Sequence, residues 1–203
     1  MNAAHKLVLE AYLATEERSA VKREFLGGEI VALSGGRPAH NVVTSRLTAE
    51  LDAALRGRPC LVFSADQRVH LEATEDYCYP DLVVTCERPR FVPPAPDSLT
   101  NPTAVFEVVS PTTESWDRGG KFTLYQGIPS LALYVLVDPA RRRVEWYTRV
   151  EGSDAWLYRS AAGDTPARLD PLDVSLVPNT LFAALDLLPA EDAQVPPASS
   201  ATR

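Results

Sequence analysis

The sequence lacks the features that mark several large classes of protein. No run approaches the ~20 apolar residues of a membrane-spanning helix, and no apolar segment follows a basic start at the N-terminus. Phosphate-binding glycine loops and the glycine-flanked serine of a nucleophile elbow are also missing. These absences favour a cytoplasmic protein without a membrane span or signal peptide, and they exclude two common kinds of catalytic site.

Positive charge is in short supply too. The chain carries 20 Lys and Arg against 27 Asp and Glu, which gives a net charge of −7. This balance argues against a protein that coats nucleic acid through a broad basic surface. It is compatible with an enzyme that has an acidic metal site. The one dense basic cluster, Arg141-Arg142-Arg143, is of a kind that is usually a solvated turn.

Cysteine and histidine are scarce, with three of each. Cys60, Cys78 and Cys86 form no Cys-x-x-Cys pair, so the usual spacing of a zinc site is absent. Cys78 and Cys86 flank an apolar run, but nothing in their spacing establishes a disulfide between them. We expect reduced, structural thiols in a cytosolic protein.

What is present suits a folded protein with a sizeable core. The chain has 203 residues, of which 45% are hydrophobic and 23% charged, as expected for one globular domain. We assign that domain to residues 1–188. From residue 189 to 203 the chain is rich in Pro, Ala and Ser, and we expect a disordered tail.

Helical and strand patterns alternate along the chain, which predicts an α/β fold. Apolar residues at helical spacing predict helices over 3–17 and 40–56, and a third from about 113 to 126. Gly27-Gly28 marks the turn of a β-hairpin within 23–33. Further strands are predicted at 60–63, 67–71, 80–85, 104–109, 131–137, 143–147, 155–160 and 175–177, with a last short helix that starts at 179–180 and ends by 188.

Two of these predicted strands each contain one carboxylate. Asp81 follows a proline at the start of the 80–85 run, and Glu107 lies in the middle of the 104–109 run. A carboxylate in an apolar strand costs free energy unless something pairs with it. If the strands are neighbours, both carboxylates can bind one divalent cation, and hard oxygen ligands select Mg²⁺ or Mn²⁺.

A lysine is the remaining part of such a hydrolytic site. A Glu-x-Lys tripeptide would place it at position 109, but that residue is Val109. Lys121 is the replacement that we predict. It lies on the next helix four residues after Asp117, so the two side chains share a helix face, and Tyr125 continues that face. Such a lysine can orient a water or stabilise developing charge.

Plainer structural roles remain open for each of these residues. Asp81 can cap a turn, and Lys121 can be a surface residue paired with Asp117. Glu29, which closes the early hairpin, and His40, which opens the long helix, are further candidates for the site. Each has an ordinary surface or capping role as its alternative.

Six segments of the chain together carry a resemblance to a known family. They are Arg23-Glu24-Phe25-Leu26-Gly27-Gly28-Glu29-Ile30, His40-Asn41, Tyr79-Pro80-Asp81, Phe106-Glu107-Val108-Val109-Ser110-Pro111-Thr112-Thr113, Asp117-Arg118-Gly119-Gly120-Lys121-Phe122 and Ile128-Pro129-Ser130-Leu131. In this order they resemble the Uma-two family of bacterial proteins assigned as restriction endonucleases. That family is similar to the PD-(D/E)xK nuclease superfamily.

The resemblance implies a restriction-endonuclease-like fold, with a mixed central sheet flanked by helices. It also implies a magnesium-dependent phosphodiester hydrolase site, in which Asp81 and Glu107 match the motif carboxylates and Lys121 is the lysine moved onto the helix. The chain departs from the family pattern at Phe25, where Tyr is more usual, and at Ala132, where an acidic residue is more usual. Neither departure touches the expected metal ligands.

Three functions are compatible with these residues. The first is a metal-dependent endonuclease, with DNA as the expected substrate. The second is a non-catalytic binding or assembly module that has kept the fold, which the acidic net charge favours slightly. The third is a hydrolase of a small phosphate ester that uses the same metal pair. A homodimer is plausible for a sheet fold of this type.

Overall fold

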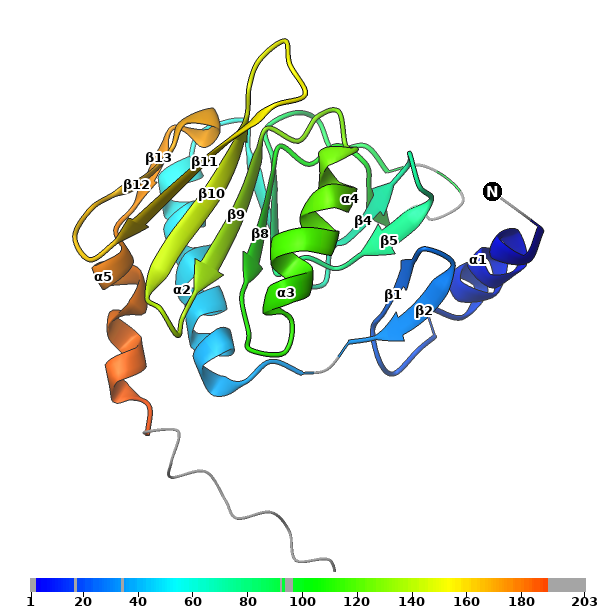
Figure 1. Cartoon of the computed structure of the whole chain (residues 1–203), viewed down its shortest axis with the longest axis horizontal. Helices are drawn as coiled ribbons and strands as arrows, with labels where there is room; N and C mark the ends of the chain where they lie inside the picture. The colour runs from blue at the N-terminus through cyan, green and yellow to red at the C-terminus, as the bar shows by residue number, and fades with distance from the viewer. Residues whose placement is uncertain (1–2, 17, 34, 92, 94–96, 190–203) are drawn as a thin grey trace, which may run out of the picture.

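A computed structural model describes residues 3–16, 18–33, 35–91, 93 and 97–189 of the chain. It has an α/β architecture of two larger sheets, one small sheet and flanking helices (Figure 1). Within the described ranges, no helix is long and apolar enough to cross a membrane. Apart from residue 189, the tail expected over 189–203 lies outside those ranges.

The larger sheet has six strands in the order β11-β10-β9-β8-β6-β3. Its central pair, β8 and β9, is parallel, and every other neighbouring pair is antiparallel. A parallel pair needs a crossover connection, and the segment between β8 and β9 supplies it as a helical layer. The strands are β3 (Leu61–Ser64), β6 (Leu82–Thr85), β8 (Ala104–Val108), β9 (Leu133–Asp138), β10 (Arg143–Arg149) and β11 (Trp156–Ala162).

The second sheet has five short strands in the order β2-β1-β5-β4-β7, and a third sheet pairs β12 with β13. The hairpin β1–β2 joins the second sheet through one register pair, Phe25 with Tyr77. The strands are β1 (Arg23–Leu26), β2 (Glu29–Ala32), β4 (Arg68–Leu71), β5 (Asp76–Cys78), β7 (Ser98–Leu99), β12 (Ala167–Leu169) and β13 (Val174–Leu176).

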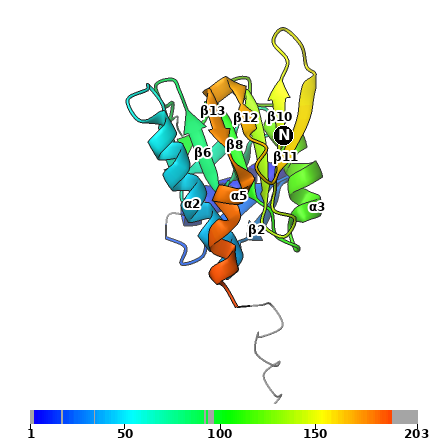
Figure 2. The ribbon, with the colours of Figure 1, turned by 90° about the vertical axis from the view of Figure 1, so that its left-hand side faces the viewer.

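Helices cover both faces of the six-stranded sheet. In Figures 1 and 2, α2 and α5 lie on one face, and α3 and α4 lie on the other. A π-helical turn, η1, connects α3 to α4. The helical elements are α1 (Ala3–Glu16), α2 (Pro38–Leu55), α3 (Glu114–Trp116), η1 (Asp117–Lys121), α4 (Phe122–Gln126), η2 (Asp170–Leu172), α5 (Pro178–Phe182) and η3 (Ala183–Leu187).

Strand β8 runs through the centre of the core, and all five of its residues are buried. Alternate side chains of a strand point to opposite faces. Phe106 packs in the cluster that contains the apolar stripe of α2, whereas Val105 packs with Tyr125 of α4. Glu107, two residues after Val105, therefore belongs to the α4 face.

The predicted helices over 3–17 and 40–56, the hairpin and the long strands are confirmed by the structure. Strands β5, β7 and β12 were not predicted, because two or three residues are too short to show a period. The predicted helix over 113–126 is not continuous, since η1 interrupts it. The hairpin pairs with β5 of the second sheet and not with β6, the strand beside Asp81.

The expectation of three reduced cysteines was wrong for two of them. Cys60 and Cys86 form a disulfide, and Cys78 is a free, buried thiol. The strand register explains the pairing. Cys60 precedes β3 and Cys86 follows β6, and their neighbours Leu61 and Thr85 are opposite each other in this antiparallel pair. Continued by one residue, this register places Cys60 opposite Cys86.

Reduction of the Cys60–Cys86 disulfide is expected to lower the free energy of unfolding by about 3 kcal/mol, because the bond closes a loop that spans 26 positions. Urea unfolding with and without dithiothreitol measures the effect. A Cys60→Ala/Cys86→Ala variant should unfold like the reduced protein and ignore the reductant. Equal stability of oxidised and reduced protein would contradict this expectation.

Candidate active site around Lys121

The ammonium of Lys121 lies among three carboxylates. Its Nζ is 3.1 Å from Glu107 Oε1, 3.5 Å from Glu24 Oε1 and 3.8 Å from Asp117 Oδ1. Only 9% of the lysine side chain is exposed, and each carboxylate is less exposed still. Charges buried to this extent are tolerated only when they are paired and hydrogen-bonded, so the four side chains form one interdependent group.

Three separate elements bring this group together. Glu107 projects from β8 toward α4, where the Tyr125 hydroxyl donates to Glu107 Oε1 over 3.2 Å. Glu24 lies on β1 of the second sheet and accepts a 2.9 Å hydrogen bond from the backbone N–H of Tyr79. Asp117 and Lys121 are the two ends of η1. The site thus lies where the two large sheets and the crossover helices meet.

Glu24 is the residue of this group that sequence reasoning missed. It is 2% exposed, next to the fully buried Phe25. The signal that could have found it is the same one that identified Glu107, namely a carboxylate between residues of a short strand. In a four-residue strand that signal is weak, because the strand also contains Arg23 and shows no clear alternation.

The π-helical turn depends on a glycine. A Cβ on Gly120 would lie 1.8 Å from the ring of Trp116, whereas a Cβ on Gly119 would have nothing within 4 Å. The bare backbone of Gly120 therefore makes room for the Trp116 ring one turn earlier. π-helical turns are rare in proteins, and those that do occur often lie at functional sites. Here it sets the direction in which Lys121 leaves the helix.

Asp81 lies immediately before β6 and is attached to the strand that carries Glu107. Its Oδ2 accepts a 2.7 Å hydrogen bond from the backbone N–H of Val108, and its Oδ1 is 3.0 Å from Nε2 of His40. The loop before α2 approaches His40 closely, since a Cβ on Gly36 would be 2.6 Å from His40 Nδ1. The structure thus places His40 beside Asp81 and Asp81 beside Glu107.

Glu29 is not brought into this arrangement. All four residues of β2 are exposed, and Glu29 is opposite Leu26 in the hairpin. Among the described residues, no hydrogen bond or ion pair joins Glu29 to the carboxylate group. A catalytic role for Glu29 stays a prediction without geometric support.

The electrostatics of the site reflect its burial. Burial raises the pKa of Glu107 well above its usual value, and the nearby carboxylates of Asp81, Asp117 and Glu24 act in the same direction against Lys121. Burial raises the pKa of Asp117 as well. Burial alone would lower the pKa of Lys121, but the surrounding carboxylates raise it well above the usual value. The lysine is therefore held as a cation.

His40 is also biased toward its charged form. Its hydrogen bond to Asp81 is the largest influence and raises the pKa of the imidazole, although burial opposes it. In total, four carboxylates gather against two basic side chains, Lys121 and His40. The four are Glu24, Asp81, Glu107 and Asp117. This excess of acidic over basic groups is what a divalent cation would offset.

The donor set fits magnesium as a partial shell. Within the described ranges, no three His, Cys, Asp or Glu side chains are arranged to hold a metal ion by themselves. Mg²⁺ commonly takes one or two protein carboxylates and completes its shell with water and substrate phosphate. Asp81, with 17% of its side chain exposed, and the adjacent Glu107 offer such a pair of oxygen ligands.

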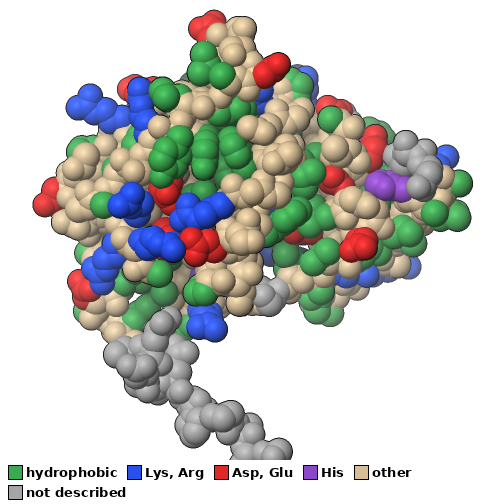
Figure 3. Space-filling model, in the orientation of Figure 1, with side chains coloured by type: hydrophobic (Ala, Val, Ile, Leu, Met, Phe, Trp, Pro, Cys, Tyr) green, Lys and Arg blue, Asp and Glu red, His purple; other side chains and the backbone are tan. Residues whose placement is uncertain are grey.

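Charged side chains next to the site form a balanced network. Arg118 makes ion pairs with Glu114, Asp138 and Glu145, and Arg141 pairs with two of the same acids. Figure 3 shows Lys and Arg side chains next to acidic ones on this face of the molecule. Arg142 pairs with Asp186. The basic cluster at 141–143 is therefore largely neutralised and is no open cationic patch.

The chain is similar to a known protein family and to individual proteins. The model of the Uma2 family, described as "Putative restriction endonuclease", matches residues 9–181. Two proteins of Synechocystis sp., both described as uncharacterized, are similar along most of their length. Protein sll1609 is 35% identical over 78% of this chain and 89% of its own, and slr1290 is 34% identical over 89% and 93%.

A solved structure shows the same fold. It is described as a "putative nuclease belonging to DUF820" from Anabaena variabilis. It matches with a TM-score of 0.72 over 87% of this chain and 98% of its own, at 16% sequence identity. The restriction-endonuclease-like arrangement of mixed sheets and flanking helices, expected from the sequence, is thereby confirmed.

Substitution of Gly120 by alanine is expected to destabilise the protein by about 1–3 kcal/mol, because the new methyl group must displace the Trp116 ring. The matched change Gly119→Ala should have little effect or a small stabilising one, since nothing lies near its Cβ position. Urea unfolding and tryptophan fluorescence measure both variants. Equal behaviour of the two would show that the Trp116 contact does not constrain η1.

Replacement of Lys121 by methionine is expected to cost about 3–5 kcal/mol of stability at pH 8, because three carboxylates are left buried without their cation. A carboxyl whose pKa is raised on folding binds more protons in the folded state, so its contribution favours folding as the pH falls. The defect should therefore shrink toward pH 5. The measurement is urea unfolding at both pH values in the presence of a chelator.

The control for this experiment is Lys6→Met on α1, where the lysine side chain is 70% exposed. It should leave the stability and its pH dependence unchanged. A Lys121→Met/Glu107→Gln double variant should recover part of the loss at pH 8. A defect in Lys121→Met that is the same at both pH values would contradict the buried-charge explanation.

Proposed function

Since the chain belongs to the Uma2 family, we propose that it is a magnesium-dependent endonuclease that hydrolyses phosphodiester bonds of nucleic acid, with DNA as the substrate. The observation that carries this proposal is the convergence of Asp81, Glu107 and Lys121, which come from three separate segments. Family membership and the fold support a nuclease. The metal and the nucleic-acid type are part of the proposal. So is a cytoplasmic location, where bacterial DNA lies.

In this proposal Asp81 and Glu107 hold Mg²⁺, or Mn²⁺ in its place. Such an ion, when bound, neutralises charge on a phosphoryl oxygen and lowers the pKa of a water molecule. The protein's own contribution is to hold both carboxyl groups in place. His40 holds one oxygen of Asp81 and the Val108 N–H holds the other, so the side chain is fixed before any ligand arrives.

Lys121 and Tyr125 fix the side chain of Glu107 in the same way. Both contact Glu107 Oε1, which leaves Oε2 without a hydrogen-bond partner among the described side chains. Lys121 also brings a permanent positive charge to a buried place, where it counters the charge of a phosphate more strongly than in water. Glu24 is a positioning residue, because it connects Lys121 to the backbone of Tyr79.

A binding module without catalysis is the second candidate, and one observation favours it. Lys121 shares its charge with three carboxylates, and the arginines of the neighbouring network are paired with acids. A module of this kind would serve binding or assembly and would not cleave DNA in Mg²⁺ or Mn²⁺.

We also propose a homodimer. The edge strand β2 is exposed along its whole length and presents Ile30 and Val31, which are 38% and 41% exposed. An exposed apolar edge strand is a template for pairing with another chain. Sedimentation of the wild type and an Ile30→Lys/Val31→Lys variant measures the oligomeric state. A wild type that sediments as a monomer would contradict this part of the proposal.

Purified protein is expected to cleave plasmid or linear DNA in Mg²⁺ or Mn²⁺ and to be inactive in a chelator. Asp81→Asn and Glu107→Gln should each lower the rate by at least about 100-fold, because several kcal/mol of charge stabilisation are lost with the ion. Calorimetry should show one ion bound to the wild type and a weaker affinity in both variants.

Glu151→Gln, at an exposed turn, is the control and should cleave like the wild type. Glu29→Gln should also retain activity, since Glu29 is exposed on β2 and no hydrogen bond or ion pair joins it to the carboxylate group among the described residues. Cleavage that survives Asp81→Asn and Glu107→Gln would overturn the assignment of the site. DNA binding without cleavage would favour the binding module. Hydrolysis of a chromogenic phosphodiester, with DNA left intact, would favour a small-ester hydrolase.

A further inference from the structure

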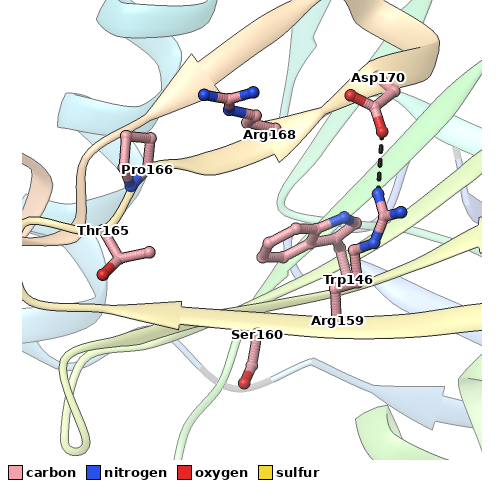
Figure 4. A pocket seen from close by; sticks show the side chains of 7 residues that line it. All are labelled: Trp146, Arg159, Ser160, Thr165, Pro166, Arg168 and Asp170. Carbon is pink, nitrogen blue, oxygen red and sulfur yellow. Dashed lines mark hydrogen bonds and ion pairs between the residues drawn. The ribbon is translucent and has the colours of Figure 1, made fainter.

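A hollow on the opposite face of the six-stranded sheet takes no part in the site around Lys121. It has a volume of about 570 Å³ and lies between the β10–β11 pair and strand β12 (Figure 4). Its buried wall, Trp146, packs in the core cluster that contains α2, β12 and β13, whereas Tyr125 packs in the cluster of the other face. The hollow is lined by Trp146, Arg159, Ser160, Thr165, Pro166, Arg168 and Asp170.

The polar groups of the hollow are mainly hydrogen-bond donors. Nε1 of Trp146 is buried and has no hydrogen-bond partner among the described residues, although the ring is only 4% exposed. Arg168, on the facing strand, makes no hydrogen bond or ion pair within the described ranges. Arg159 is held by Asp170 across 2.9 Å. In Figure 4 the side chain of Ser160 points away from the others and contributes nothing here.

The charges of the hollow select an anion. Two arginines face one carboxylate, Asp170, so one positive charge is left unbalanced in a chain whose net charge is −7. A single carboxylate without histidine or cysteine does not suit a metal ion. A guanidinium presents a planar fork of donors that matches the oxygens of a phosphate. A buried indole N–H without an acceptor adds a further donor on the wall.

We propose that this hollow is a binding site for a small phosphate-bearing molecule, with Arg168 as the principal contact and Arg159 and Trp146 as supporting donors. The volume lies in the range of small-molecule sites, which suits inorganic phosphate or a nucleoside monophosphate. Two arginines, one of them already paired, are too few to follow a nucleic-acid backbone, which takes many phosphate contacts. The site is separate from the carboxylates of the proposed nuclease centre.

Calorimetry on the full chain, with inorganic phosphate and with adenosine monophosphate as probes, tests this proposal. We expect saturable binding of at least one probe, and an affinity at least about tenfold lower in Arg168→Gln, because one charge-assisted hydrogen-bond partner is lost. Arg90→Gln is the matched control. It removes the same charge from an exposed position after β6. Strand β6 lies near one edge of the six-stranded sheet and β11 forms the other edge, so the Arg90→Gln protein should bind the probes like the wild type.

The indole N–H resonances give a second readout that folding defects do not mimic. The chain has three tryptophans, so three such signals are expected, and Trp146→Phe identifies the one from the hollow. A probe that binds should shift that signal and leave the other two in place. Glu107→Gln should bind the probes normally, which separates this site from the nuclease centre.

Several results would overturn the proposal. They are the absence of saturable binding of both probes at millimolar concentration, equal affinity in Arg168→Gln and the wild type, and an equal loss in Arg90→Gln. A shift confined to Trp116 or Trp156 would also overturn it. If a short DNA strand binds and depends on Arg168 while neither small probe does, the hollow belongs to a nucleic-acid surface and the proposal fails.

Discussion

The contact between Glu107 and Lys121 is the interaction on which the rest of the site depends. A carboxylate in the middle of a fully buried strand costs several kcal/mol unless a cation accompanies it. Lys121 meets that need, but a buried ammonium needs more than one acceptor. Glu24 and Asp117 supply the others, and so the hairpin of the second sheet and the turn η1 are tied to the central strand. The charges thus determine how three elements dock.

This dependence explains why the site could be predicted in part. Asp81, Glu107 and Lys121 could be singled out as candidates because a carboxylate in an apolar strand, or a lysine four residues from an aspartate, is a local signal. The helices, the hairpin and the long strands follow from local periodicity for the same reason. Glu24 escaped because its role comes from the docking of β1 beside the end of β5, and no local pattern records a contact between residues 55 positions apart.

Two other features of the structure were not predicted from the sequence, also because they depend on contacts between elements. The Cys60–Cys86 bond follows from the antiparallel register of β3 and β6, which the sequence does not state. The π-helical turn follows from the contact between Gly120 and the Trp116 ring, whereas the spacing of Asp117 and Lys121 predicts an ordinary helix. Periodicity describes elements one at a time, and both features arise only when neighbouring parts of the chain are placed in space.

The surroundings of Val109 and Lys121 show why the ammonium of this group comes from η1 and not from the strand of Glu107. Alternate side chains of a strand share a face, so a lysine at position 109 would lie on the same side as Glu107. Val109 instead packs in the apolar cluster of Tyr125 and Leu136. With the lysine on η1, the ammonium reaches Glu107 and finds Asp117 on its own turn and Glu24 on β1. Val109 thus lets the apolar cluster close beside a cation that enters from the helix.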